Sequence, residues 1–356
     1  MAYTTINKSA DYFNTKLYTG DGSSSKSITG VGFQPDLVWV KSRVATHNHF
    51  LWDVVRGVQK RISSNGNGAE GTDTNGLASF DSDGFTLGNK GSINSNTDNY
   101  ASWNWKAGSS NTSVSASGSG NGAYNACTYR ANTTAGFSIV QYTGRNGDIN
   151  NGDSSRVTHG LGVKPDFIII KRTDSSENWA VIRGNSNDNH LVLNDTGAAS
   201  GSFYTGNQNA DATSTYFVVG NSGRVNQEGG TFIAYVFAEK TGYSKFGTYT
   251  GNGNADGTFV YTGFKPAWVL MKKSDGVEDW AMFDSTRDTH NVQYKLLYAN
   301  GTNAEYTGVT ARNDFLSNGF KIRTTDNKEN ASGGTYIYMA FGQSLVGSNN
   351  VPCTAR

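Results

Sequence analysis

The sequence has few cysteines, few prolines and no excess of one charge. Only 2 cysteines occur among 356 residues, Cys127 and Cys353, and they form neither a metal-binding spacing nor a disulfide framework. We therefore expect two free thiols in a chain that folds in a reducing cytoplasm. The 30 basic residues balance 29 acidic ones, for a net charge of +1, and no basic stripe occurs. This pattern argues against nucleic-acid binding.

Long apolar runs are also missing. The longest lies near residues 232–238 and is too short to span a bilayer, so we expect no membrane insertion. The first residues, MAYTTINKSADYF, lack the charged start and apolar core of a secretory signal. The sequence is instead rich in glycine (44 residues) and in aromatic residues (12 %), with Asn- and Ser-rich segments between short apolar runs. Such a composition is typical of all-β proteins.

One phrase that contains proline occurs three times. It reads GFQPDLVWVK, GVKPDFIIIK and GFKPAWVLMK, and its conserved positions are Pro35, Pro165 and Pro266 at the start and Lys41, Lys171 and Lys272 at the end. Proline fits the start of a strand, where its missing N–H does least harm, and a continuous apolar run indicates a strand that is covered on both faces. We expect each lysine to keep its charge in solvent at the strand end.

Four further landmarks accompany each copy in the same order. A Tyr-Thr-Gly turn precedes the phrase, and a tryptophan, a Gly-Phe or Tyr-Phe strand and an aromatic closing strand follow it. The tryptophans are Trp52, Trp179 and Trp280, and the closing strands begin at Tyr100, Phe232 and Tyr336. Alternation in the closing strands predicts that one of their faces is more polar. Five landmarks in one order, three times over, indicate an internal repeat.

The sequence therefore predicts an all-β protein of three tandem antiparallel β-sandwich repeats, jelly-roll-like in architecture. The expected repeats are residues 1–107, 137–240 and 241–344. A Gly/Ser/Asn-rich segment at 108–136 is expected to be a linker, and residues 345–356 a C-terminal tail. Because the junction between the second and third repeats is short, we expect these two to pack closely and the first to sit apart.

Residues suited to catalysis occur without a recognisable arrangement. The sequence has no Gly-x-Ser-x-Gly elbow, and its candidate acids form no evident pair. These acids are Asp53, Glu278 and Asp284. His47 and His49 could share a strand face and bind a metal, but an exposed loop pair is the favoured interpretation, and His159 is interpreted as structural. We predict no enzyme activity, no metal and no cofactor.

Aromatic rings near Asn and Asp side chains suit stacking on sugars. The candidates are Trp52, Trp103, Trp105, Trp179 and Trp280. Aromatic residues that recur at equivalent positions more often pack a core, so both alternatives stay open and the core is favoured. The clusters of Asp, Asn and Gly at 21–22, 148–153 and 252–256 could hold Ca²⁺, although turn geometry alone explains them.

The first copy contains YTGDGSSSKSITGVGFQPDLVWVKSR, HFLWDVVRG and ASWNWKAG, and the second contains AGFSIVQYTG and VTHGLGVKPDFIIIK. These phrases resemble a repeat found in virion proteins of marine bacteriophages. The resemblance extends from about Thr4 to Phe341. It implies a virion protein that is assembled in the host cytoplasm and exposed on the particle, with tail or capsid proteins as partners. In the third copy Ala267 replaces the aspartate found at Asp36 and Asp166, which implies different contacts.

The repeats and the resemblance support three functions in descending order. The first is host attachment as a tail-fibre or receptor-binding protein, with a host surface glycan as one receptor class. The second is a capsid decoration protein or head fibre. The third, a glycan depolymerase, lacks a visible carboxylate pair. Virion fibres are commonly trimeric, so a homotrimer is one expectation, and a pseudo-oligomer of three repeats within one monomer is the alternative.

Overall fold

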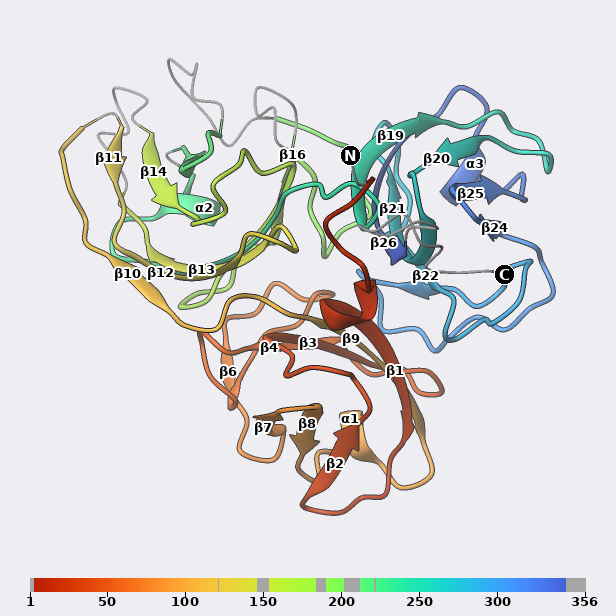
Figure 1. The fold of residues 1–356 in the computed structure, drawn as a ribbon, viewed down its shortest axis with the longest axis horizontal. Coiled ribbons are helices and arrows are strands. Elements are labelled where there is room, and N and C mark those ends of the chain that lie inside the picture. Colours follow the sequence, from red (N-terminus) through yellow and green to blue (C-terminus); the bar gives the residue numbers. More distant parts are fainter. Residues whose placement is uncertain are drawn as a thin grey trace.

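The computed structural model describes residues 3–120, 122–145, 154–183, 190–201, 212–220 and 222–343. Strands dominate these residues, so the predicted all-β class is confirmed. Figure 1 shows three lobes around a common centre. We call them unit 1 (β1 to β9), unit 2 (β10 to β18) and unit 3 (β19 to β26), and a 3-10 turn, η1 (Ser9–Asp11), precedes unit 1.

Unit 1 contains a sheet of order β1-β9-β3-β4, a sheet of order β2-β8-β7 and the small pair β5-β6. Its elements are β1 (Phe13–Thr19), β2 (Lys26–Thr29), β3 (Leu37–Ser42), β4 (Phe50–Asp53), β5 (Lys60–Arg61), β6 (Gly71–Thr72), β7 (Leu77–Asp81), β8 (Gly84–Leu87), α1 (Gly91–Asn94) and β9 (Asn99–Trp105). All of its strand pairs are antiparallel.

Unit 2 contains a sheet of order β10-β12-β13-β18-β15-β16 and a sheet of order β11-β14-β17. Its elements are β10 (Thr112–Val114), β11 (Ala123–Tyr124), β12 (Cys127–Asn132), β13 (Phe137–Thr143), β14 (Ser155–Thr158), β15 (Phe167–Arg172), β16 (Ala180–Arg183), β17 (Tyr216–Val219), α2 (Gly223–Asn226) and β18 (Thr231–Phe237). The segment 108–136 differs from its expected role as a linker, because β10, β11 and β12 lie in it and extend both sheets. β11 pairs with β14 in parallel.

Unit 3 contains a sheet of order β19-β26-β21-β22-β23 and a sheet of order β20-β25-β24. Its elements are β19 (Ser244–Thr250), β20 (Phe259–Tyr261), β21 (Lys265–Lys273), β22 (Ala281–Asp284), β23 (Leu297–Tyr298), β24 (Asn313–Leu316), β25 (Gly319–Ile322), α3 (Asn327–Asn330) and β26 (Thr335–Gln343). The repeated prolines lie where expected: Pro35 and Pro165 precede β3 and β15, and Pro266 is the second residue of β21.

Each unit encloses an apolar cluster between its two sheets. In unit 1, Val38 and Val40 on β3 face this cluster together with Phe85 on β8. The corresponding clusters of units 2 and 3 contain Ile168 and Met271. Because successive side chains of a strand point to opposite faces, the other half of each apolar run must be covered by something else.

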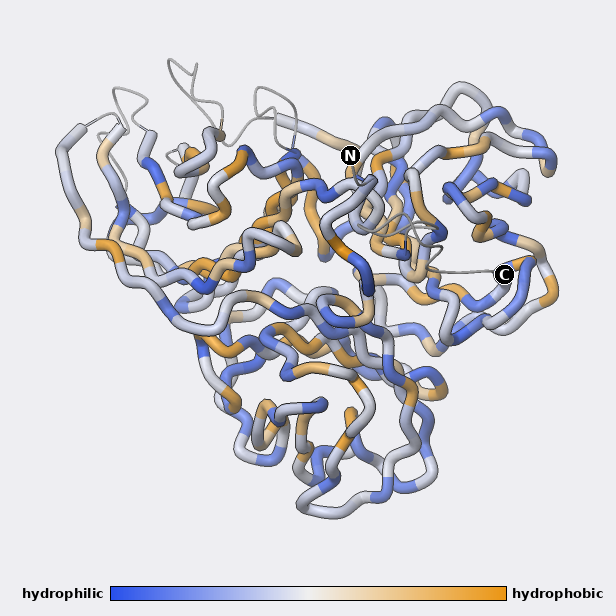
Figure 2. The backbone as a smooth tube through the Cα atoms, in the orientation of Figure 1, coloured by the Kyte–Doolittle hydropathy of each residue, from blue (hydrophilic) through white to orange (hydrophobic). Residues whose placement is uncertain are grey.

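That cover is a single core shared by the three units. Leu37 and Trp39 of unit 1 lie in it with Ile169 of unit 2 and Trp268 of unit 3. Unit 1 therefore packs against the other two units and does not sit apart as expected. The closing strands β9, β18 and β26 are buried on both faces, because their outer faces also form the shared core. Figure 2 shows hydrophobic stretches inside the lobes and toward the centre, where Figure 1 draws the strands.

Each Tyr-Thr-Gly turn packs tightly against one of the short helices, which the sequence did not predict. A β-carbon on Gly144 would lie 2.0 Å from the Gln227 carbonyl oxygen, just after α2, so only glycine fits. The Asn226 side chain, at the end of α2, accepts a hydrogen bond of 2.9 Å from the backbone N–H of Arg145. Asn94 and Asn330 make the same contact to Asp21 and Asn252. Turn chemistry therefore accounts for the polar clusters at 21–22 and 252–256, whereas 148–153 lies outside the described residues.

Candidate functional site

The five tryptophans named as sugar-stacking candidates are all buried. Their relative exposures are 0 % for Trp52, Trp103 and Trp179, 1 % for Trp280 and 2 % for Trp105. A ring without an accessible face cannot stack on a sugar. These residues therefore form core and not a surface site.

The strand register shows that Trp52 is not equivalent to Trp179 and Trp280. Val38 pairs with Trp52, and the residues equivalent to Val38 pair with Ile182 in unit 2 and with Phe283 in unit 3. The residue that matches Trp179 and Trp280 is His49, which also directly precedes its strand. In each case an asparagine side chain accepts the backbone N–H at 2.8 Å, and these asparagines are Asn65, Asn194 and Asn300.

Two of these matched residues, Trp179 and Trp280, join neighbouring units. Trp179 Nε1 of unit 2 donates to the Ser63 carbonyl of unit 1 at 2.8 Å, and Trp280 Nε1 of unit 3 donates to the Val192 carbonyl of unit 2 at 2.8 Å. His49 accepts from Trp39 Nε1 at 2.8 Å, and its pKa is lowered well below the usual value mainly by burial. It is therefore a neutral core residue, and it forms no exposed pair with His47.

Backbone hydrogen bonds follow the same cycle. The N–H of Glu70 in unit 1 donates to Thr173 in unit 2, that of Ala199 in unit 2 to Ser274 in unit 3, and that of Glu305 in unit 3 to Arg43 in unit 1. All three bonds measure between 2.7 and 2.8 Å. Each unit thus uses one surface to contact the next and a different surface to contact the previous one, and the three contacts close into a ring.

The repeated lysines are buried, which corrects the expectation that their charges lie in solvent. Lys41, Lys171 and Lys272 each have 0 % exposure, because they lie on the face of their strand that turns toward the neighbouring units. Their ammonium groups donate to backbone carbonyls at the end of the strand or just beyond it, such as those of Ser42 and Gly276. Burial lowers the pKa of each to about 8.

Two of the three candidate acids, Asp53 and Asp284, form ion pairs at two unit boundaries. Asp53 pairs with Arg56 at 2.6 Å and accepts a hydrogen bond of 2.9 Å from Tyr235 of unit 2. Asp284 pairs with Arg287 and accepts from Trp103 Nε1 of unit 1. Neither carboxylate has any exposed surface, and the two lie in different units. They do not form a carboxylate pair across a groove, and Glu278 lies apart from them in a loop that contacts unit 2.

Other candidate groups are also structural. His159 is buried, with Nε2 at 3.1 Å from the Thr213 carbonyl and Nδ1 accepting from the Leu161 N–H. Cys127 lies buried in β12, where burial raises its thiol pKa to about 11, so it is not an activated nucleophile. Cys353 lies outside the described residues. Within the described ranges, no group of three or more His, Cys, Asp or Glu side chains is placed to hold a metal ion.

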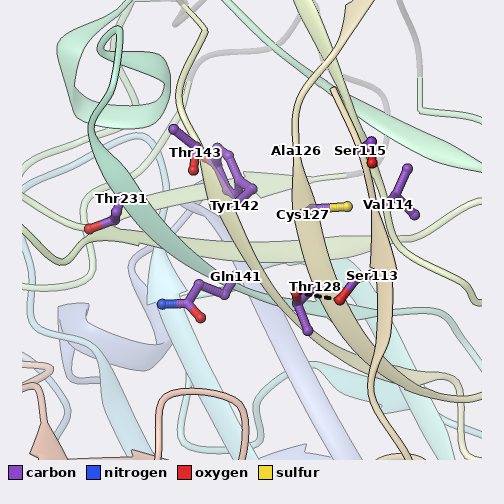
Figure 3. Close-up of a pocket in the computed structure, with 10 residues that line it drawn as sticks. All are labelled: Ser113, Val114, Ser115, Ala126, Cys127, Thr128, Gln141, Tyr142, Thr143 and Thr231. Atoms are coloured by element: carbon purple, nitrogen blue, oxygen red, sulfur yellow. Dashed lines mark hydrogen bonds between the residues drawn. The ribbon is translucent and has the colours of Figure 1, made fainter. Parts of the chain in front are cut away.

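The main candidate site is an open groove of about 340 Å³ on unit 2. Figure 3 shows side chains from β10, β12, β13 and the start of β18 around it. Its polar lining consists of Ser113, Ser115, Thr128, Gln141, Thr143 and Thr231, and no charged residue lines it. Ser113 and Thr128 hydroxyls face each other at 3.1 Å.

The strand pattern explains why this groove is polar. Val140 and Tyr142 on β13 point into the core of unit 2, so Gln141 and Thr143 point to the opposite face. Nearer the centre of the ring the same face carries Ile139 and belongs to the shared core. On this face, the part of the sheet near the centre carries apolar side chains, and the outer part carries hydroxyl and amide side chains. Sequence reasoning missed this groove because it treated 108–136 as a linker.

The chain matches a family model described as Domain of unknown function (DUF7483) over residues 8–344. The chain belongs to this family. The match includes all three units and the segment between the first two, so the family's domain corresponds to the whole ring. No curated protein and no solved structure matches the chain. Within the described residues, every helix is too short to cross a membrane.

Proposed function

We propose that the chain is a bacteriophage virion protein, exposed on the particle, that attaches to the host as a tail-fibre or receptor-binding component. The site proposed for attachment is the groove of unit 2, and its proposed ligand is a neutral host surface saccharide. The resemblance of the repeated phrases supports the virion assignment. The uncharged hydroxyl and amide lining supports the ligand class.

The chemistry of the groove fits a sugar better than it fits an ion or a lipid. Ser, Thr and Gln side chains both donate and accept hydrogen bonds, as sugar hydroxyls do. The lining offers no cation for a phosphate and no acid pair for hydrolysis. A glycan depolymerase is therefore less well supported than simple binding. The proposal includes no enzyme activity and no cofactor.

Isothermal titration of the intact protein with purified host polysaccharide tests this proposal. Gln141→Ala and Thr143→Val should each weaken binding about tenfold, since each removes hydrogen bonds to the ligand. Thr250→Val is the matched control, because Thr250 follows Tyr249 in unit 3 as Thr143 follows Tyr142 in unit 2. Equal loss in all three variants, or no binding by the unaltered protein, would contradict the proposal.

The ring itself favours a second candidate, a capsid decoration protein or head fibre. A body of three similar lobes fits a three-fold position in a shell lattice, where each lobe meets an equivalent neighbour. Cryo-electron microscopy of the intact particle distinguishes the two. Density of this shape on the tail would support attachment, and density at regular lattice points on the head would support decoration.

We also propose that the three units are diverged copies of one jelly-roll-like β-sandwich. The matching sheet pairs, the matching register and the recurring bond from each turn to the asparagine at the helix end support common descent. A ring closed within one chain needs no partner copies, so a monomer is preferred over a homotrimer. Sedimentation at a mass near 38.2 kDa would agree with the monomer, and a mass three times larger would contradict it.

A further inference from the structure

An exposed aromatic patch lies on an edge strand of unit 3. β20 is the outermost strand of its sheet, and its outward side chains Phe259 and Tyr261 are 43 % and 59 % exposed. Val260 between them is buried. Tyr3, 43 % exposed, donates a hydrogen bond of 2.9 Å from its hydroxyl to the Gly263 carbonyl and lies beside Tyr261. The patch consists of Tyr3, Phe259 and Tyr261.

The other two units show that the fold does not require these rings. Val260 pairs with Phe320 as Ile28 pairs with Phe85 and Val157 with Phe217, so β20 corresponds to β2 and β14. By this register the positions of Phe259 and Tyr261 hold Ser27 and Thr29 in unit 1, and Arg156 and Thr158 in unit 2. Polar residues therefore suffice to build this edge. Exposed rings that folding does not need are a common mark of an interaction surface.

Unit 2 shows what can occupy this edge. There β11 adds to β14 as a parallel strand, and the Asn125 N–H donates to the Arg156 carbonyl at 2.8 Å. Tyr124 on β11 packs edge-on against Tyr216 with ring centroids 5.7 Å apart, and the Arg156 guanidinium lies over both rings. The added strand is thus held by backbone hydrogen bonds and by an aromatic contact.

The same backbone groups point outward in unit 3. The Ile322 N–H donates to the Thr258 carbonyl, and the Thr262 N–H donates to the Asn318 carbonyl. The backbone groups of Thr258 and Thr262 therefore face β25. The N–H and carbonyl groups of Phe259 and Tyr261 consequently face away from β25. Within the described residues no strand pairs with this edge. An exposed strand edge with unpaired backbone groups is a template for another strand.

We propose that β20 binds an extended segment of a partner polypeptide, which adds as a strand parallel to β20 and packs an aromatic side chain against Phe259 and Tyr261. The mode is β-augmentation, in which backbone bonds provide affinity and side chains provide selectivity. A second copy of this chain is a poorer occupant, because two β20 edges related by a two-fold axis would pair antiparallel. The internal precedent is parallel.

The test uses the intact, isotope-labelled protein and a synthetic peptide of residues 119–128, which contains β11. The edge of β14 is already occupied by its own β11, and the edge of β2 has Ser27 and Thr29 in place of the two rings. The peptide should therefore perturb the backbone amide signals of Phe259 and Tyr261 but not those of Ser27 and Thr29. No perturbation at millimolar peptide, or equal perturbation at both edges, would overturn the proposal. A mass that rises with protein concentration and falls on adding peptide would assign the edge to a second copy instead.

Two variants separate backbone pairing from simple adhesion to rings. Phe259→Ser combined with Tyr261→Thr gives the edge of unit 1 and should weaken peptide binding about tenfold. Tyr261→Pro removes an outward N–H but no bond to β25, and should weaken it further than Tyr261→Thr alone. Equal effects of these two single substitutions would show that no strand is added. Unchanged far-ultraviolet circular dichroism checks that each variant is folded.

Discussion

Trp179 of unit 2 and Ser63 of unit 1 are joined by a hydrogen bond of 2.8 Å between indole Nε1 and a backbone carbonyl. The two residues are 116 positions apart in the chain, and the tryptophan is completely buried. The same bond recurs between Trp280 and Val192 one unit further on. A contact that recurs from unit to unit indicates that the boundaries are built by one geometric rule, and its energetic weight can be measured.

Trp179→Phe should destabilise the protein more than Trp52→Phe does. Both substitutions shrink a buried ring, but Trp52 Nε1 has no hydrogen-bond partner whereas Trp179 Nε1 bonds to Ser63. The difference in the free energy of unfolding should be about 1 kcal/mol, the usual net value of such a bond. Urea denaturation of the two variants measures it. Equal losses would mean that the bond across the boundary contributes nothing.

Lys272→Met should reduce the rise of stability at alkaline pH. Burial lowers the Lys272 pKa from 10.5 to about 8, so between these values the unfolded chain binds more protons than the folded one. Stability contributed by this group therefore increases as pH rises through that window. The half-buried Lys265→Met serves as control. Plotted against pH across this window, the denaturation midpoint should rise less steeply for Lys272→Met than for the unaltered protein and for Lys265→Met. Identical slopes would mean that burial does not lower the pKa of Lys272.

Glu329→Gln should have the opposite pH signature. Burial raises the pKa of Glu329 to about 8 from 4.5, even though Arg312 lies 3.2 Å away. The folded protein holds this proton between the two values, so stability falls as pH rises through them. Glutamine cannot titrate and should remove that fall, leaving the variant at least as stable as the unaltered protein near pH 8. The exposed Glu228→Gln should leave the slope unchanged.

Gly144→Ala should destabilise unit 2 by about 1–3 kcal/mol, the usual cost of overpacking. The added carbon would lie 2.0 Å from the Gln227 carbonyl oxygen, and the turn cannot move without breaking the bond from Arg145 to Asn226. Gly68→Ala is the control, because a carbon there meets nothing within 4 Å. Thermal unfolding compares the two. A neutral Gly144→Ala would mean that α2 is not packed against this turn.

Much of the secondary structure could be predicted from periodicity and proline placement. The apolar runs after Pro35, Pro165 and Pro266 became central strands, because four apolar residues in succession need cover on both faces. What covered the second face could not be predicted, since period-2 patterns do not say whether the outer layer is another sheet or another unit. For the same reason the lysines that end these runs were expected in solvent.

The candidate site was harder to predict than the fold. Composition alone suggested a linker at 108–136, whereas alternation in Cys127–Asn132 was the available signal for β12. The correspondence of Trp52 with Trp179 and Trp280 was wrong for a related reason. A shared residue type does not show that two positions are structurally equivalent. The strand pairings of Val38 and Ile168 show that the counterpart of Trp179 is His49, three positions before Trp52.

The closing contact of the ring has a consequence for the order of the chain. The Ser9 N–H donates to Gln343 Oε1 at 2.7 Å, and Phe13 stacks on Phe341 with ring centroids 5.2 Å apart. The beginning of unit 1 therefore touches the end of unit 3 much as consecutive units touch each other. A peptide link there, with the chain reopened between β18 and β19, would describe the same molecule as a circular permutant. The contacts between the units therefore do not depend on which unit comes first in the chain.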